Sequence, residues 1–137
     1  MSNPLTVDAS VFVNAFSATE AGSEDSWRFL LGLKESNTLI IVPSLLLVEV
    51  VAAIARKQNN TEQAQHWMLE IQRIPNITFV SLDESLADTA ARLAAHYRLR
   101  GSDAIYAAIA TRFATELISL DGEHLERLKE VVPVRKP

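Results

Sequence analysis

The sequence contains no cysteine in its 137 residues. This absence excludes disulfide bonds, zinc sites built on thiolates and a cysteine nucleophile. A chain without disulfides suits a reducing compartment, so the expected location is the cytoplasm.

The sequence also lacks a long hydrophobic run. Its longest apolar stretch, residues 39–54, is interrupted by Pro43, Ser44 and Glu49 and is shorter than the roughly 20 residues that span a bilayer. The first residues do not combine a charged segment with an apolar one, so no secretory signal is predicted. We therefore expect no contact with a membrane.

Positive charge is in deficit, with 17 acidic against 13 basic residues and a net charge of −4. This balance argues against a protein that holds nucleic acid by bulk positive charge. A bound divalent ion would weaken the objection, because it changes the local field that a phosphate meets. The hydrophobic content of 48% is enough for one ordinary core, so residues 1–137 are expected to form a single domain.

Short β-rich runs alternate with helical patterns along the chain, which predicts an α/β fold with a central, mainly parallel sheet of four or five strands. A short strand at residues 131–134 is expected to finish the sheet, and the tail at 135–137 is expected to fray. The other strands are predicted at 5–7, 39–42, 77–80 and 117–120, and the helices at about 10–15, 24–35, 44–57, 61–73, 84–98, 103–114 and 123–130.

Glu49 lies in residues 45–54, a segment that is apolar on almost every side of a helix and is therefore expected to be buried. Its neighbours three and four residues away are all apolar, so no local basic partner is available. An uncompensated buried carboxylate is expensive, which favours a functional ligand. The alternative to a ligand is that Glu49 lies at the edge of the helix and is neutralised or reaches Arg56.

Asp8 and Asp121 directly follow predicted strands, and ligands of open α/β sheets bind at the carboxyl ends of parallel strands. Asp103 opens an alanine-rich helix. Each acid alone could be a cap or turn residue, but all four can converge on one crevice. Two unit charges about 4 Å apart repel by roughly 1 to 4 kcal/mol, so such a cluster needs a cation. Oxygen ligands without cysteine or paired histidine favour Mg²⁺ or Mn²⁺.

These acids lie in four segments that resemble the motifs of the PIN-domain family, in particular the VapC toxin ribonucleases of type II toxin–antitoxin pairs. Residues 7–10 resemble the first motif, 46–50 the second, 101–110 the third and 117–121 the fourth. The fourth motif commonly has threonine two places before its acid, whereas this chain has Ser119 and keeps the hydroxyl.

The resemblance implies a three-layer α/β/α fold with about seven helices, and one or two Mg²⁺ or Mn²⁺ ions. It also implies hydrolysis of RNA by a metal-activated water, a homodimer and an antitoxin partner. The residues implied or chosen as candidates are Asp8, Glu49, Asp103 and Asp121 as metal ligands and catalytic acids, Ser10 and Ser119 as supporting hydroxyls, and Arg56, Arg100 and Arg112 as contacts for RNA phosphate.

Three functions other than a toxin ribonuclease are compared with the sequence. A host RNA-processing nuclease and a non-catalytic scaffold that binds RNA or protein remain alternatives to a toxin. Phosphoaspartyl enzymes fit less well, because residues 8–10 lack a second aspartate and no suitably placed lysine follows a late strand. The histidines are expected to be surface or core residues, and His124 is the one that could approach the site.

Overall fold

A computed structural model describes residues 2–137. Within that range, seven helices and a five-stranded parallel sheet confirm the predicted α/β fold. The elements are β1 (Leu5–Val7), α1 (Ala9–Ala15), α2 (Ser23–Glu35), β2 (Ile40–Pro43), α3 (Leu45–Gln58), α4 (Thr61–Gln72), β3 (Ile77–Val80), α5 (Glu84–Tyr97), α6 (Gly101–Phe113), β4 (Glu116–Ile118), α7 (Gly122–Leu128) and β5 (Val134–Arg135).

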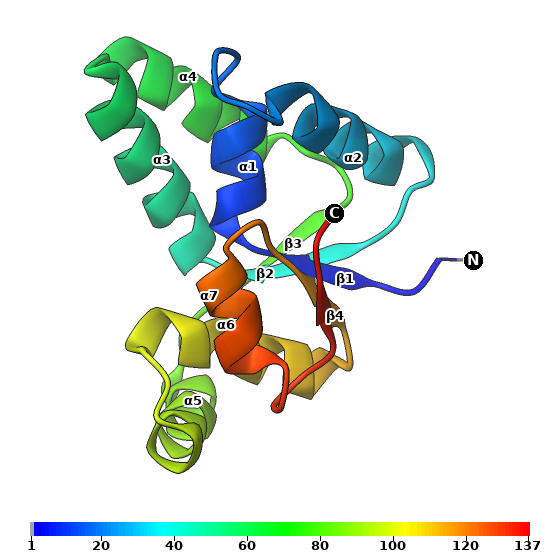
Figure 1. The fold of residues 1–137 in the computed structure, drawn as a ribbon, viewed down its shortest axis with the longest axis vertical. Coiled ribbons are helices and arrows are strands. Elements are labelled where there is room, and N and C mark those ends of the chain that lie inside the picture. The colour runs from blue at the N-terminus through cyan, green and yellow to red at the C-terminus, as the bar shows by residue number, and fades with distance from the viewer. Residues whose placement is uncertain (1) are drawn as a thin grey trace.

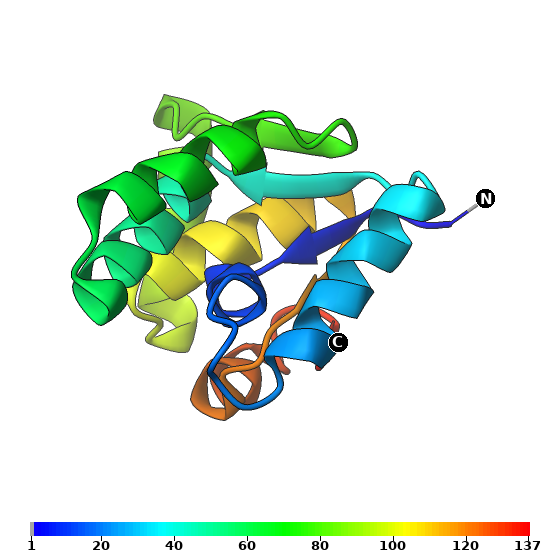
Figure 2. The same ribbon diagram turned by 90° about the horizontal axis from the view of Figure 1, so that it is seen from above.

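The strands follow the order β3-β2-β1-β4-β5, and every neighbouring pair is parallel. Strands β1 and β2 are buried along their whole length, as expected for a sheet covered on both faces. Figure 1 shows α1 and α2 on one side of the sheet and α5 and α6 on the other. In Figure 2, α3 and α4, in green, lie beyond the arrowheads of β1 and β2.

The chain changes direction at the boundary between β1 and β4. From β1 it proceeds to β2 and then β3, and it returns through α5 and α6 to β4 on the other flank of β1. Adjacent strands whose connections diverge leave an open crevice at their carboxyl ends. The register sets Val7 beside Ile118, and the amide of Asp8 donates to the Ile118 carbonyl at 2.8 Å. Asp8 therefore lies next to Ser119 at this crevice.

Helix α6 packs against β1, β2 and β4, and its small alanine side chains allow it to lie close to the strands. It begins at Gly101, two residues before the predicted start, so Asp103 is its third residue. Arg100 occupies the N-cap position without a side-chain hydrogen bond. The Asp103 carboxylate binds side chains of α7 and does not cap its own helix.

Helix α3 is less buried than its apolar sequence predicts. Leu46, Val50 and Ile54 form its one fully buried stripe, whereas Val48 is 64% exposed. The helix packs mainly against α1 and α4, and another side of it lines the crevice. The exposure of this apolar helix explains how Glu49 can be reached from outside.

The carboxyl-terminal strands are shifted from their predicted positions. Strand β4 ends at Ile118, two residues before the predicted end, and β5 covers residues 134–135 where 131–134 was predicted. Arg135 was expected to fray, but it pairs with Ile118 in the ladder and its Nε donates to Glu116 Oε1 at 2.8 Å. Pairing with β4 fixes this part of the tail.

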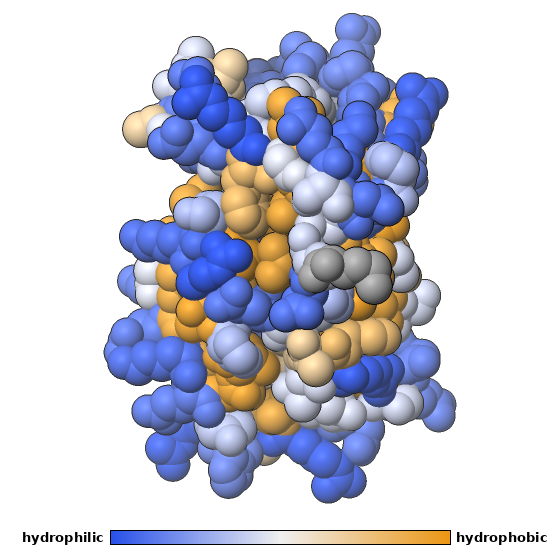
Figure 3. Space-filling view, turned by 90° about the vertical axis from the view of Figure 1, so that its right-hand side faces the viewer, coloured by the Kyte–Doolittle hydropathy of each residue, from blue (hydrophilic) through white to orange (hydrophobic). Residues whose placement is uncertain are grey.

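Figure 3 shows the face of the molecule that lies on the right in Figure 1. Hydrophobic side chains gather in the middle of this face, and hydrophilic side chains surround them at both ends. Among residues 2–137, no helix has the length and hydrophobicity that crossing a bilayer requires.

The buried stripe of α3 provides a test of the fold. We expect Leu46→Ala to lower the free energy of unfolding by about 2 to 5 kcal/mol, because it leaves a cavity beneath a fully buried side chain. Val48→Ala on the exposed side of the same helix should change it by about 0.5 kcal/mol or less. Urea unfolding followed by circular dichroism measures both values, and equal losses would contradict the observed packing of α3.

Candidate active site

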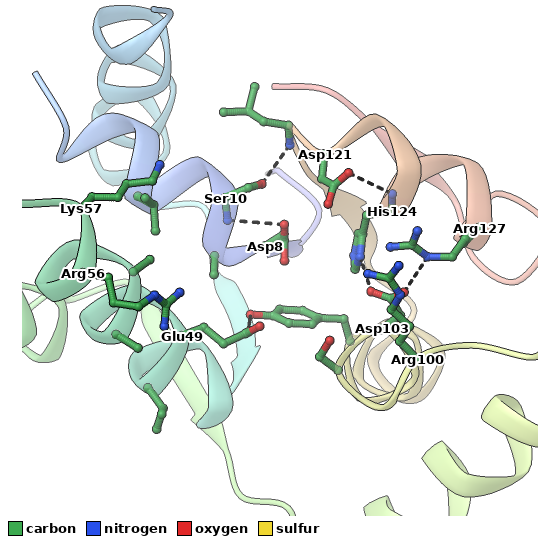
Figure 4. A pocket seen from close by; sticks show the side chains of 18 of the residues that line it. Asp8, Ser10, Glu49, Arg56, Lys57, Arg100, Asp103, Asp121, His124 and Arg127 are labelled. Carbon is green, nitrogen blue, oxygen red and sulfur yellow. Dashed lines mark hydrogen bonds and ion pairs between the residues drawn. The ribbon is translucent and has the colours of Figure 1, made fainter. Parts of the chain in front are cut away.

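A cleft of about 630 Å³ opens at the carboxyl ends of β1 and β4. Side chains from α1, α3, α6 and α7 line it, and all four predicted acids, Asp8, Glu49, Asp103 and Asp121, are among them. Figure 4 shows Asp8 in the centre, Glu49 on the side of α3, and Asp103 and Asp121 on the opposite side. Acids separated by more than 100 residues in the chain thus share one cavity.

Asp8 is buried and is held by one of its two oxygens. Its Oδ2 accepts from Ser119 Oγ at 2.9 Å and from the Ser10 amide at 3.4 Å. Ser119 Oγ also accepts from the Asp121 amide at 3.1 Å, and Ser10 Oγ accepts from the Leu120 amide at 3.0 Å. The two predicted hydroxyls therefore tie the strand ends together, and Ser119 also orients an acid.

Asp121 caps helix α7 with Oδ1, which accepts from the amides of Glu123 at 3.0 Å and His124 at 3.3 Å. The cap satisfies backbone donors that have no partner inside a helix. Asp121 is exposed, unlike Asp8, so its other oxygen is accessible from the cleft.

Glu49 accepts a hydrogen bond at 2.8 Å from the hydroxyl of Tyr106, which is only 1% exposed. Burial raises the pKa of Glu49, the Tyr106 hydrogen bond lowers it, and the nearby charges of Asp8 and Asp103 raise it further. Burial and the nearby charges of Glu49 and Asp8 raise the pKa of Tyr106 well above its usual value, so the phenol remains a donor. One oxygen of Glu49 is therefore fixed by a hydrogen bond, and the ionised form of this side chain is energetically unfavourable.

Both oxygens of Asp103, which is 3% exposed, already have partners from α7. His124 Nδ1 lies 2.5 Å from Oδ1, and Arg127 Nε donates to Oδ2 at 2.8 Å. A buried carboxylate of this kind is tolerable because it has a cationic partner and hydrogen bonds.

Basic side chains lie on opposite sides of the cleft, Arg56 and Lys57 on one and Arg100 and Arg127 on the other (Figure 4). Lys57 is bound to Glu20 at 2.9 Å. Within residues 2–137, Arg56 and Arg100 form no ion pair, which leaves their guanidinium groups available for a ligand. The third predicted phosphate contact, Arg112, does not line the cleft and instead donates to Ser85 Oγ.

Sequence reasoning missed two residues of this cleft, Tyr106 and Arg127. Tyr106 lies in an alanine-rich helix and is buried like a core residue, but its hydroxyl donates to Glu49. Arg127 belongs to none of the four motifs. The available signal was its position six residues after Asp121, nearly two turns along the same helix. His124 was recognised as able to approach the site, and the structure places it against Asp103.

The donor chemistry of the cleft fits a divalent cation. Among residues 2–137, Asp8 Oδ1, Glu49 Oε2 and Asp121 Oδ2 have no hydrogen-bond partner, and hard cations prefer such carboxylate oxygens. Within the same range, no three acidic or histidine side chains already lie close enough together to enclose an ion. Rotation of side chains such as the exposed Asp121 is therefore needed to gather the ligands.

The family model of the PIN domain matches residues 5–131. The match covers most of the chain and includes all four acids, so this protein belongs to the PIN-domain family. No curated protein sequence matches the chain.

Several solved structures with this fold are toxins or toxin–antitoxin complexes. Mycobacterium tuberculosis VapC20, described as a toxin that cleaves the sarcin–ricin loop, has a TM-score of 0.76 at 17% identity over 98% of this chain and 99% of its own. VapBC2 of Rickettsia felis, bound to a promoter DNA fragment, gives 0.73 at 15% over 98% of both chains. FitAcB of Neisseria gonorrhoeae gives 0.73 at 15% over 97% of both. At these identities the likeness shows the VapC-type fold.

The raised pKa of Glu49 predicts how its substitution affects stability. The folded state holds a proton on Glu49 more tightly than the unfolded state, so this residue makes the free energy of unfolding fall as pH rises from the usual glutamate range through the raised pKa. Glu49→Gln should remove that loss. In EDTA, we expect the variant to gain melting temperature relative to wild type as the pH rises above the usual glutamate pKa of about 4, measured by calorimetry. A difference that stays constant as the pH rises would contradict the prediction.

The Tyr106 hydroxyl should be what limits the shift at Glu49. Tyr106→Phe removes the donor while keeping the buried ring, so the pKa of Glu49 should rise further. A carboxyl ¹³C titration by NMR measures this value directly. Tyr97→Phe, at an exposed tyrosine at the end of α5, is the matched control and should leave the titration of Glu49 unchanged.

Proposed function

We propose that this protein is a divalent-metal-dependent endoribonuclease that hydrolyses RNA phosphodiesters with a metal-activated water. The observation that carries the proposal is the set of three carboxylate oxygens without hydrogen-bond partners, from Asp8, Glu49 and Asp121, around one cleft. A purely structural role gives no reason to bring three carboxylates to one cleft, because like charges repel and Asp8 and Glu49 are costly to bury.

The proposed cofactor is Mg²⁺ or Mn²⁺. Asp8, Glu49 and Asp121 would hold it through their free oxygens. Asp103, whose two oxygens are bound by His124 and Arg127, would add its negative charge to the site. When bound, the ion supplies a water of lowered pKa and charge for the developing oxyanion. The protein holds these acids in place with Ser119, Tyr106, the α7 backbone amides and Arg127.

The RNA would lie across the cleft with its phosphates between the two basic sides. Arg56 and Arg100 have free guanidinium groups at opposite sides, and arginine binds phosphate oxygens without reading sequence. A local pair of this kind offsets the overall negative charge, because the phosphate meets the rim of the cleft and not the whole surface. Arg112 does not line the cleft, so its position does not support a role in binding phosphate.

The biological role we propose is that of a toxin paired with an antitoxin, and a homodimer as its assembly. Support comes from the VapC-type fold, shared with a toxin that cleaves the sarcin–ricin loop and with VapBC and FitAB complexes. A host RNA-processing enzyme would have the same site, so the gene next to this one distinguishes the two roles. A scaffold would bind RNA or protein without cutting.

Cleavage of labelled tRNA, rRNA fragments and generic single-stranded RNA tests the activity, with Mg²⁺, Mn²⁺ or EDTA. Wild type should cut only with metal and leave 5′-phosphate and 3′-hydroxyl ends. Asp8→Asn should lower the rate about 100-fold or more, because it removes a charged ligand. The control Asp88→Asn changes an exposed acid on α5 and should retain full activity.

Products that end in 2′,3′-cyclic phosphate would contradict the metal-water chemistry. Cleavage that persists equally in Asp8→Asn would show that the acids of the cleft are structural. RNA binding without cleavage under every metal condition would favour the scaffold.

A further inference from the structure

His124 contains a buried polar atom without a partner. The side chain is 5% exposed and lines the cleft, and its Nδ1 is bound to Asp103. Its other ring nitrogen, Nε2, is buried and forms no hydrogen bond in residues 2–137. Buried polar atoms in native proteins are almost always satisfied, so an exception in a cleft requires an explanation.

The surrounding protein does not provide that explanation. The ring of Tyr106 meets that of His124 edge to face, but the centroids are 6.0 Å apart. A ring nitrogen lies close to its own centroid, so this separation is too long for a hydrogen bond from Nε2 to the face of the tyrosine. The Tyr106 hydroxyl already donates to Glu49. The partner of Nε2 is therefore something that the chain itself does not supply.

The pattern around the ring is that of a metal ligand. Metal-binding histidines usually donate the N–H of one ring nitrogen to a carboxylate, which fixes the ring and leaves the lone pair of the other nitrogen for the ion. Nδ1 faces the Asp103 carboxylate at 2.5 Å, and in the neutral imidazole this leaves the proton on Nδ1 and the lone pair on Nε2. In Figure 4 the ring lies between Asp121 and Asp103, with Asp8 beside it.

We infer that His124 Nε2 is a ligand of the divalent ion, together with free oxygens of Asp8, Glu49 and Asp121, and that Asp103 orients the imidazole. This inference rests on the metal site of the proposed function, and it changes the donor set from oxygen alone to oxygen and nitrogen. Arg127, bound to the other oxygen of Asp103, holds that carboxylate toward α7.

The mixed donor set has a consequence for the choice of metal. Carboxylates accept Mg²⁺ and Mn²⁺ alike, whereas imidazole suits transition metals and is a poor ligand for Mg²⁺. The site should therefore prefer Mn²⁺ over Mg²⁺. Removal of His124 should reduce this preference, because the remaining ligands are oxygens.

Pulsed electron paramagnetic resonance on the full chain with Mn²⁺ tests the ligand directly. The spectrum should show coupling to one ¹⁴N nucleus, and growth with ¹⁵N-histidine should replace it with ¹⁵N coupling. This comparison needs no variant, so it does not depend on how a substitution at a buried position folds. Mn²⁺ that binds without histidine coupling, or no binding of Mn²⁺ at all, would overturn the inference.

Titration calorimetry with Mn²⁺ and Mg²⁺ supplies the second measurement. His124→Gln should weaken Mn²⁺ binding about tenfold or more and affect Mg²⁺ much less. His66→Gln, at an exposed histidine on α4, is the matched control and should change neither affinity. Equal weakening for both metals would contradict ligation by nitrogen.

The outcomes separate this inference from the nuclease proposal. RNA cleavage by a protein whose Mn²⁺ shows no nitrogen coupling would retain the proposed function and remove the role of His124. Nitrogen coupling in a protein that cuts no RNA would retain the histidine ligand and remove the nuclease.

Discussion

The parallel pairing of β1 with β4 is the constraint on which the site depends. These strands come from opposite ends of the chain, and their register brings Asp8 within hydrogen-bond distance of Ser119, 111 residues away. Their connections diverge, so no helix closes the gap at their carboxyl ends. Helix α7 begins at Gly122, with Asp121 as its N-cap, shortly after this pairing, and so the positions of His124 and Arg127 follow from it as well.

The acids of the cleft differ in how the protein compensates their charge. A hydroxyl and an amide stabilise Asp8, a buried phenol stabilises Glu49, helix amides stabilise Asp121, and a cation with a histidine stabilises Asp103. The compensation is incomplete at three of the four, where one oxygen has no protein partner. Glu49 shows the result most clearly, because burial and its acidic neighbours raise its pKa. A cation would remove this repulsion, which links metal binding to the stability of the fold.

Positions that depend on local pattern were predictable. Asp8 and Asp121 followed recognisable strands, and Glu49 was conspicuous because an apolar helix offers it no neighbouring base. Prediction was weaker where tertiary packing decides. The apolar composition of α3 predicted burial on almost every side, but within residues 2–137 a single stripe of this helix is fully buried and another side lines the cleft. Arg112, predicted to contact phosphate, lies outside the cleft. The side from which its side chain leaves α6 depends on how that helix is rotated against the sheet.

The sequence by itself determined the alternation of strands and helices, the type of fold and the four acids at the ends or beginnings of those elements. These features arise from hydrophobic period and from residues that begin or end a helix, which are properties of neighbouring residues. Only the tertiary structure decided the partners: Tyr106 with Glu49, and His124 and Arg127 with Asp103. Each of these contacts joins different helices, and their relative rotation and distance are set by packing on the sheet, which no local pattern encodes.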